Sequence, residues 1–332
     1  MTWFEVLTGF SEISPNQVRQ NLTVDGETLT SLVNEKRMTC GTLETPSLGE
    51  LRQRVSAGKR IRGQLVLREI VANVQDLHVD TSNAGALFQV ASQFNLLEMP
   101  SSAVTPEQGV GKYEHDPTQG PACAVAAGAG TIYRNYFAPV NGQTGQSAHN
   151  QIDCLADLGK ALGNSDNQLW EMRNGYALAS ASGLKAIRQR LQTSNEAERD
   201  ALRQLLRIGI QWNTQVTLKG CTHKVSQAYC SALPVAYSDH SPSLWEDFAR
   251  LVLEASYEAT ICAAILNMQT NGSNHIFLTM VGGGVFGNER AWIMAGLERA
   301  LTMYQDWGLD VAMVSYGGSR PEVRQLTEQF RA

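Results

Sequence analysis

Residues 274–290, with the sequence NHIFLTMVGGGVFGNER, decide the fold of this chain. Residues 276–281 are a short apolar run with β-branched and aromatic side chains, which predicts a buried strand. Three consecutive glycines follow, with a fourth at Gly287, and apolar side chains then recur at helical spacing from Ile293 onward. Residues 309–316 (LDVAMVSY) predict the next buried strand. The stretch is therefore a strand–loop–helix–strand unit whose loop is largely bare backbone.

This glycine loop is expected where ligands bind in open α/β sheets, beyond the carboxyl end of a strand. Glycines let main-chain N–H groups approach phosphate oxygens, and the N-terminus of the following helix adds a partial positive charge. A tight turn needs one or two glycines for steric reasons alone. The four glycines here favour a loop that binds an anion or a nucleotide phosphate. The pattern is neither G-x-G-x-x-G nor a Walker loop, because no Gly-Lys-Ser/Thr follows.

Composition limits the function classes. The chain has 332 residues, 43% of them hydrophobic, and a net charge of −5, which argues against a general binder of nucleic acid or of membrane surfaces. Its six cysteines contain no CxxC pair and its six histidines are dispersed, so we expect free thiols and no metal site. No signal peptide and no stretch of membrane-spanning character is expected. A cytoplasmic protein is the prediction.

Predicted strands alternate with predicted helices along the chain, which indicates an α/β fold: a three-layer α/β/α sandwich with a mixed central sheet. Residues 1–60 are expected to be an N-terminal extension packed on a single domain of residues 61–332. Capping boxes at Ser47 and Ser243 each predict the start of a helix. The expected strands are 20–24, 28–33, 38–43, 62–74, 85–92, 176–180, 208–218 and one within 224–237, with a turn region at 75–82. The other expected helices are 120–136, 148–162, 182–191 and 196–206, the last capped by Ser194.

Polar side chains follow the predicted strand 85–92. Gln93, Asn95 and Glu98 emerge together where that strand ends. An amide side chain both donates and accepts hydrogen bonds and a carboxylate accepts them, a combination that suits a diol such as a ribose. The alternative is a loop with incidental polar residues. The long connection that begins here, residues 93–119, is typical of a functional loop or lid.

A second polar cluster lies at the end of that connection, directly before a predicted helix. Asp116, Thr118 and Gln119 bring an acid, a hydroxyl and a carboxamide to the helix N-terminus, and Pro121 fits its first turn. The alternative is ordinary helix capping by Asp116 or Thr118. Asp116 and Glu98 are the two carboxylates that we expect to act in catalysis, with Glu114 in reserve.

The motifs at 91–95 (ASQFN) and 281–288 (VGGGVFGN), with the long loop and the small-residue helix between them, resemble a macrodomain. More narrowly, they resemble the poly(ADP-ribose) glycohydrolase-like and effector-type macrodomain hydrolases, some of which remove ADP-ribose from arginine, including on ubiquitin. The resemblance covers residues 62–318. The family's triple glycine after Asn95 and its glycine-rich run ending in paired glutamates are missing, and residues 116–121 stand in their place, so the catalytic assignment stays open.

The resemblance implies roles for individual residues. Asn95 would hold the distal ribose, the glycine loop would wrap the diphosphate, and Phe286 would pack on the distal ribose or the adenine side. Asp76, or alternatively Asn73, would select the adenine. The substrate-binding residues expected are Gln93, Asn95, Gln119, Gly282, Gly283, Gly284, Val285, Phe286, Gly287, Asn288 and Asp76.

The function implied is hydrolysis of ADP-ribose from a modified protein at C1″ of the distal ribose, for example from arginine on ubiquitin. The partners are then ADP-ribose and an ADP-ribosylated protein, with no cofactor, no metal, no nucleic acid and no membrane. The protein would act in the cytoplasm, or in a host cytosol if it is a delivered effector. A second hypothesis is a reader that binds ADP-ribose or a related nucleotide without cleaving it. A NAD-consuming enzyme is disfavoured, because no catalytic His or Cys motif accompanies the loop.

Overall fold

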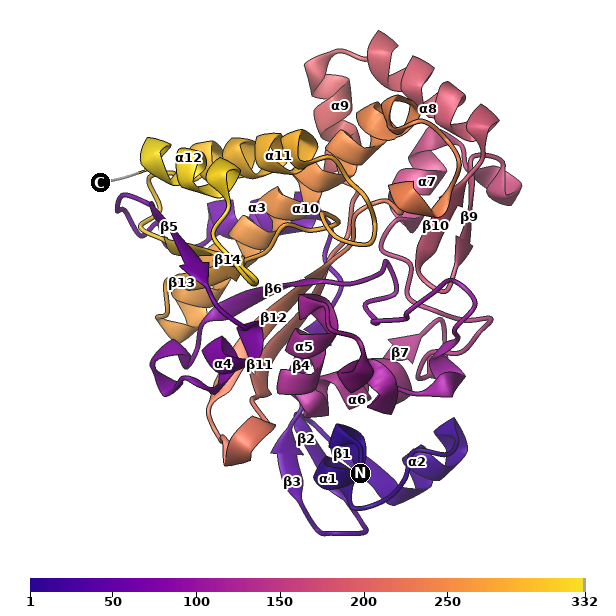
Figure 1. The fold of residues 1–332 in the computed structure, drawn as a ribbon, viewed down its shortest axis with the longest axis vertical. Helices are drawn as coiled ribbons and strands as arrows, with labels where there is room; N and C mark the ends of the chain where they lie inside the picture. The colour runs from indigo at the N-terminus through magenta and orange to yellow at the C-terminus, as the bar shows by residue number, and fades with distance from the viewer. Residues whose placement is uncertain (331–332) are drawn as a thin grey trace.

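A seven-stranded mixed sheet forms the centre of the computed structural model, which describes residues 1–330 (Figure 1). Five neighbouring strands are mutually parallel, so their carboxyl ends meet at one edge, while β11 runs antiparallel to both of its neighbours. The predicted mixed sheet is thus confirmed. In spatial order the strands are β4 (Thr42–Glu44), β11 (Gly209–Gln215), β12 (Lys224–Cys230), β6 (Leu87–Ala91), β13 (His275–Leu278), β14 (Asp310–Ser315) and β5 (Val66–Val71).

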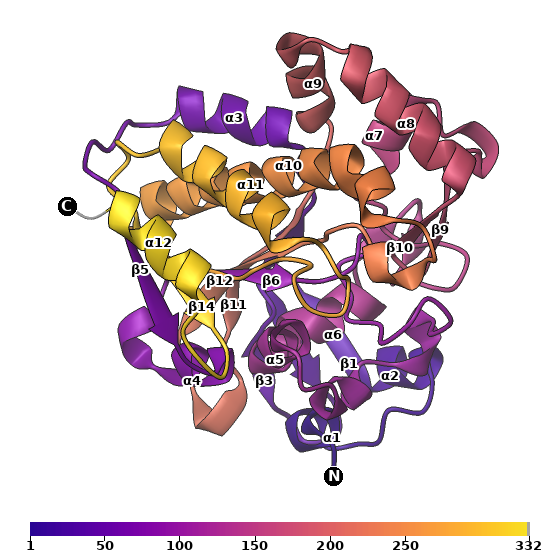
Figure 2. The same ribbon diagram turned by 45° about the horizontal axis from the view of Figure 1, so that its top comes forward.

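Helices cover both faces of this sheet, as Figure 2 shows. The sandwich therefore has the three layers that the sequence predicts. One layer holds α3 (Leu48–Ala57), α10 (Pro242–Asn271), α11 (Arg290–Met303) and α12 (Pro321–Gln329), with α8 (Ala181–Thr193) and α9 (Glu196–Arg203) packed on α10. The other holds α4 (Val74–Val79), α5 (Gln119–Ala126) and α6 (Gly128–Tyr136).

Helix α10 is the core of the first layer. By length and composition it is long and apolar enough to cross a membrane, which corrects the expectation that no stretch has that character. Inside the protein, however, 89% of its apolar window is buried, so its hydrophobic side chains meet protein on nearly all sides. The predicted capping box at Ser243 is wrong: the helix begins at Pro242 after Ser241, because proline is favoured at the first helical position.

Residues 1–60 pack on the domain and partly join it. Helices α1 (Trp3–Thr8) and α2 (Pro15–Asn21) precede a separate sheet of β1 (Leu22–Asp25), β2 (Thr28–Ser31) and β3 (Arg37–Thr39). The next strand, β4, is the edge of the central sheet and pairs with β11. The predicted capping box at Ser47 is confirmed at the start of α3, which packs on α10.

Several expected elements differ in extent. The turn region at 75–82 contains α4, the predicted strand at 20–24 begins as the end of α2, and α9 is capped by Asn195 instead of Ser194. The helix expected over 120–136 breaks at Ala127, where Gly128 packs against the side chains of Trp3 and Leu7. Only the end of 148–162 is helical. The remaining elements are α7 (Ala156–Leu162) and the hairpins β7 (Pro139–Val140) with β8 (Gln143–Thr144) and β9 (Trp170–Arg173) with β10 (Tyr176–Ala179).

Candidate functional site

A cleft of about 290 Å³ opens at the carboxyl edge of the parallel strands. The loops that follow β6, β12, β13 and β14 form its floor and walls, so the site lies where an open α/β sheet places its ligands. The sequence-predicted residues that line it are Gln93, Glu98, Asp116, Gln119, Gly282, Gly283, Gly284, Val285 and Phe286. Both predicted clusters therefore reach one cavity, although the glycine loop and the acids are far apart in the chain.

The glycine loop presents free backbone to the cleft. The structure describes no protein acceptor for the consecutive N–H groups of Gly284, Val285 and Phe286 among residues 1–330. Gly282 adopts φ +74°, and a Cβ there would lie 2.4 Å from the Cβ of Ala232, so only glycine fits. Consecutive free amides in a glycine turn form an anion-binding concavity. The loop is therefore suited to a phosphate group.

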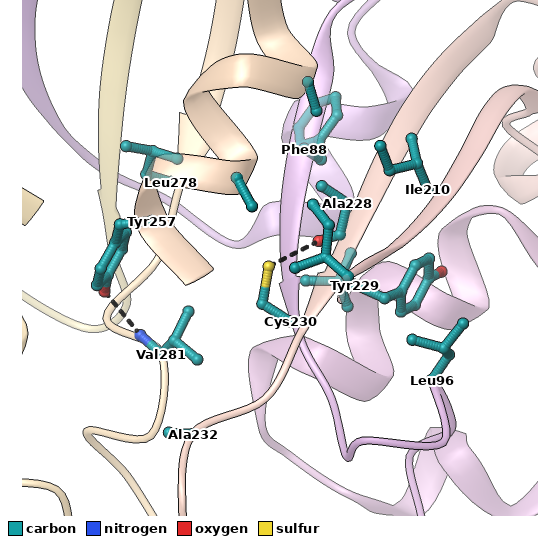
Figure 3. Packing of buried hydrophobic residues seen from close by; sticks show 14 of the residues in the cluster. Phe88, Leu96, Ile210, Ala228, Tyr229, Cys230, Ala232, Tyr257, Leu278 and Val281 are labelled. Atoms are coloured by element: carbon teal, nitrogen blue, oxygen red, sulfur yellow. Dashed lines mark hydrogen bonds between the residues drawn. The ribbon is translucent and has the colours of Figure 1, made fainter. Parts of the chain in front are cut away.

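Helix α10 and strand β6 hold the base of this loop. The hydroxyl of Tyr257 donates to the carbonyl of Thr279 (2.8 Å) and accepts from the N–H of Val281 (3.1 Å), and Figure 3 shows the second of these bonds. The side chain of Gln89 accepts from the N–H of Thr279 (3.2 Å). The loop thus leaves the sheet from a buried and hydrogen-bonded anchor, which fixes the direction of its amides.

Two of the residues predicted to bind substrate instead support the loop from below. Asn288 is 4% exposed, and its amide nitrogen donates to the carbonyl of Leu233 (2.8 Å). Gly287 lies against Ala236, whose Cβ would be 2.7 Å from a Cβ on the glycine. Neither residue lines the cleft. In the structure these two residues contact the segment after β12 and support the glycine loop, and they do not reach the cleft.

Glu98 and Asp116 face the cleft from the opposite side. Glu98 is 5% exposed, and its Oε1 is buried without a hydrogen-bond partner among the described residues. Burial raises the pKa of Glu98 well above its usual range; Arg134 opposes this rise and the Asp116 carboxylate adds to it. The environment of Glu98 therefore favours the protonated form of its carboxyl group.

Asp116 is half-buried and keeps one carboxylate oxygen uncommitted. Its Oδ1 accepts from both the N–H (2.8 Å) and the hydroxyl (2.6 Å) of Thr118, the residue that precedes α5. These bonds form a local turn before α5. The helix capping by Asp116 or Thr118 that the sequence left as the alternative does not occur within residues 1–330, because the N-cap residue Thr118 makes no side-chain cap hydrogen bond and the side chain of Asp116 bonds only to Thr118. Two carboxyl groups in one cavity, one buried and one open to solvent, are the arrangement that separates an acid from a base.

The start of α5 is packed tightly below these acids. A Cβ on Gly120 would lie 2.1 Å from the carbonyl oxygen of Ala91 and 2.8 Å from Oε2 of Glu98, so only glycine lets the helix come this close. Gln119 lines the cleft, but its Oε1 accepts from the N–H of Val74 (2.9 Å). Gln93 likewise lines the cleft while its Oε1 accepts from the N–H of Met99 (2.7 Å). The side-chain oxygens of both glutamines therefore already accept hydrogen bonds from the backbone.

Three aromatic rings form one wall of the cleft. Phe286 lies 5.3 Å from the ring of Tyr176 and 5.6 Å from that of Tyr237, between ring centroids. The hydroxyl of Tyr176 donates to the carbonyl of Met99 (2.6 Å), which ties the β9–β10 hairpin to the loop that carries Glu98. Of these three residues the sequence predicted only Phe286. No motif near Tyr176 or Tyr237 indicates that their segments fold against the cleft.

Two arginines at the cleft were also missed. Arg290, at the start of α11, and Arg320, after β14, both line the cavity. Arg290 is largely exposed, with Glu322 at 3.3 Å. Glu69 fixes the loop after β14 by accepting from the N–H of Arg320 (2.8 Å) and from the hydroxyl of Ser315 (2.6 Å). Arg290 is the last residue of the stretch 274–290, three residues after Gly287, and this position could have predicted that it lies near the glycine loop.

Asn95 and Asp76 lie outside the cleft, contrary to their predicted roles. Asn95 is fully buried: its amide nitrogen donates to Gln151 (2.9 Å) and its oxygen accepts from the N–H of Leu97 (3.1 Å). It therefore stabilises a turn under the β9–β10 hairpin. Asp76 is exposed on α4, with its carboxylate 3.4 Å from Lys219. Across residues 1–330, no group of three or more His, Cys, Asp or Glu side chains is arranged to hold a metal ion.

No protein-family model and no curated protein matches the chain. Among solved structures it is similar to poly(ADP-ribose) glycohydrolase from Deinococcus radiodurans in complex with ADP-ribose, with 12% identity, a TM-score of 0.47 and coverage of 86% of this chain and 91% of that one. It is also similar to the enzyme from Thermomonospora curvata bound to the inhibitor ADP-HPD, with 11% identity, a TM-score of 0.45 and coverage of 95% and 96%.

Proposed function

We propose that this protein is a hydrolase that releases ADP-ribose from a modified protein by cleaving the bond at C1″ of the distal ribose. One observation carries the proposal: a loop of amides without protein acceptors among the described residues and two carboxyl groups, one buried and one half-buried, line a single cleft. The amides suit a diphosphate, and the acids suit cleavage of a bond to a sugar carbon.

The binding half of the cleft would hold the diphosphate. The N–H groups of Gly284, Val285 and Phe286 have no protein acceptor among the described residues and would be free to donate to phosphate oxygens, and Arg290 and Arg320 would add positive charge. The aromatic wall offers a flat apolar surface for the sugar or the base. Held in this way, C1″ would lie toward the acids, and the rate gain would come from orientation.

The acids would divide the chemistry between them. As the bond from C1″ to the leaving group lengthens, Glu98 would donate its proton to the leaving atom, because burial favours the protonated form of its carboxyl group. Asp116 would orient a water molecule and accept its proton as the water oxygen bonds to C1″. The products are ADP-ribose and the unmodified side chain, and the two carboxyl groups exchange their protons with solvent to restore the starting state.

Two conservative variants test this division. Glu98→Gln and Asp116→Asn keep the shape of each side chain, and each should lower the turnover of a protein modified on arginine by about a hundredfold. Isothermal titration calorimetry should give an unchanged Kd for ADP-ribose in both, because neither residue contacts the glycine loop. Turnover at the wild-type rate in both variants would remove the two acids from catalysis.

The same turnover assay identifies which amino-acid linkage to ADP-ribose is cleaved and which modified protein is the substrate. Ubiquitin modified on arginine is the first substrate to test, with a protein modified on a carboxylate and poly(ADP-ribose) as comparisons. Tight binding of ADP-ribose by the wild type without release from any of these would support the reader hypothesis instead. An absence of heat with ADP-ribose would reject both.

A further inference from the structure

The N-terminal segment is hydrogen-bonded to the loop of residues 93–119, which carries Glu98 and Asp116. Oε1 of Glu12 accepts from the N–H of Val110 (2.9 Å) and from the hydroxyl of Tyr136 (2.6 Å), while Oε2 accepts from the N–H of Gly111 (2.6 Å). A Cβ on Gly109 would lie 2.4 Å from the same carboxylate, so the loop approaches it as closely as glycine allows. One side chain from the N-terminal extension thus satisfies three donors of the domain.

These bonds fix the start of a short turn, η3 (Gly111–His115), on which both acids depend. Within this turn, the hydroxyl of Tyr113 accepts from the backbone N–H of Glu98 (3.0 Å). At its end, the N–H of Asp116 donates to the carbonyl of Tyr113 (3.2 Å). The backbones of both acids are therefore hydrogen-bonded to one residue of a turn that Glu12 anchors.

Trp3 adds a second contact between the extension and this turn. Its indole N–H donates to the carbonyl of Val110 (3.2 Å), and its backbone N–H donates to the carboxylate of Glu114 (2.9 Å). Glu114, which the sequence held in reserve as a catalytic acid, thus makes a structural contact with the extension and does not line the cleft.

We infer that Glu12 is a positioning residue for the reaction: by holding η3, it sets the separation of Glu98 and Asp116 across the cleft. The inference rests on the proposed function. It assigns to the N-terminal extension a role in turnover and none in binding the diphosphate, because the glycine loop is anchored separately through Tyr257. A misplaced acid lowers the rate even when the ligand still binds.

Glu12→Gln tests the inference, because the amide keeps the size of the side chain but its nitrogen cannot accept a hydrogen bond, so at least one of the three donors loses its acceptor. We expect kcat for the arginine-modified protein to fall about tenfold, while the calorimetric Kd for ADP-ribose stays unchanged. Hydrogen–deuterium exchange should accelerate at residues 110–116. Glu107→Gln is the matched control, since Glu107 lies in the same loop and accepts only from the exposed N–H of Ala148 (2.8 Å); it should match the wild type in all three measurements.

The outcomes separate this inference from the proposed function. Wild-type kcat or wild-type exchange at residues 110–116 in Glu12→Gln would overturn the positioning role while leaving the hydrolase intact. A parallel loss of kcat and of ADP-ribose affinity would also overturn it, since it would indicate a general defect of folding. If the wild type binds no ADP-ribose, the proposed function fails, and the exchange data alone decide whether Glu12 anchors the turn.

Discussion

Burial raises the pKa of a carboxyl group when its ionised form has little solvent and no adequate partner, and Glu98 meets both conditions. Its Oε1 is buried and unpartnered, and Arg134, which favours the ionised form, has a buried Nη1 that is also unpartnered. Asp116 has the same chemistry but lies at the open end of the cleft with Thr118 as its donor. Environment, and not residue type, separates the two roles.

The raised pKa of Glu98 should make the free energy of unfolding depend on pH. Because the folded-state pKa of Glu98 is raised above its unfolded value, the stabilisation is complete below the unfolded pKa, near 4, and is lost as the pH rises toward the folded pKa. Glu98→Gln cannot ionise, so its free energy of unfolding, measured with urea from pH 4 to 9, should exceed that of the wild type increasingly as the pH rises. A constant difference across this range would show that Glu98 is ionised in the folded protein.

At the scale of elements, the glycines of the loop after β13 have two separate uses. Gly282 is required by backbone conformation and by its contact with Ala232, whereas a Cβ on Gly284 would meet no atom within 4 Å. Gly284 is therefore free of packing demands, and its N–H is one of three consecutive N–H groups at the cleft without an acceptor among residues 1–330. Packing explains Gly282 but not Gly284, for which the proposed anion binding would account.

Substitutions at these two glycines should separate folding from binding. Gly284→Asp places a negative charge beside the free amides, so it should abolish calorimetric binding of ADP-ribose while leaving the melting temperature unchanged. Gly284→Ala, the uncharged control, should fold normally. Gly282→Ala should lower the free energy of unfolding by about 2 kcal/mol, because alanine is strained at this φ and clashes with Ala232. Undiminished binding in Gly284→Asp would show that no anion binds at this loop.

The sequence predicted cleft residues after two of the strands and at the start of α5. The glycine loop, Gln93 and Glu98 follow β13 and β6, and the alternation of strands and helices was enough to bring them to one edge. Asn95 was wrong because the turn after Gln93 directs its side chain beneath the β9–β10 hairpin. The hairpin residue Tyr176 could not be predicted, since its place in the cleft depends on how a distant segment packs.

At the scale of the whole molecule, a buried ion network joins the N-terminal part of the chain to the helical layer. Glu258 on α10 is fully buried, and Arg52 on α3 donates to both of its oxygens, at 2.5 and 2.8 Å. Arg52 also pairs with Asp200 on α9 and lowers the pKa of that carboxyl to about 2. Arg299 on α11 completes the network with a contact of 2.6 Å to Glu258. Two acids, Glu258 and Asp200, and two arginines thus link the four helices α3, α9, α10 and α11.

Removing one cation should expose the dependence of the fold on this network. Arg52→Met keeps the length and the apolar stem of the side chain but leaves the buried Glu258 carboxylate with a single arginine, so the free energy of unfolding should fall by about 3 kcal/mol. Arg54→Met is the matched control on the same helix: Arg54 pairs only with the partly exposed Glu44, and its loss should cost less than about 1 kcal/mol. Urea unfolding of both variants measures the contrast. Equal stabilities would mean that α3 is held by its apolar contacts with α10 alone, and that the extension joins the domain without help from the buried charge.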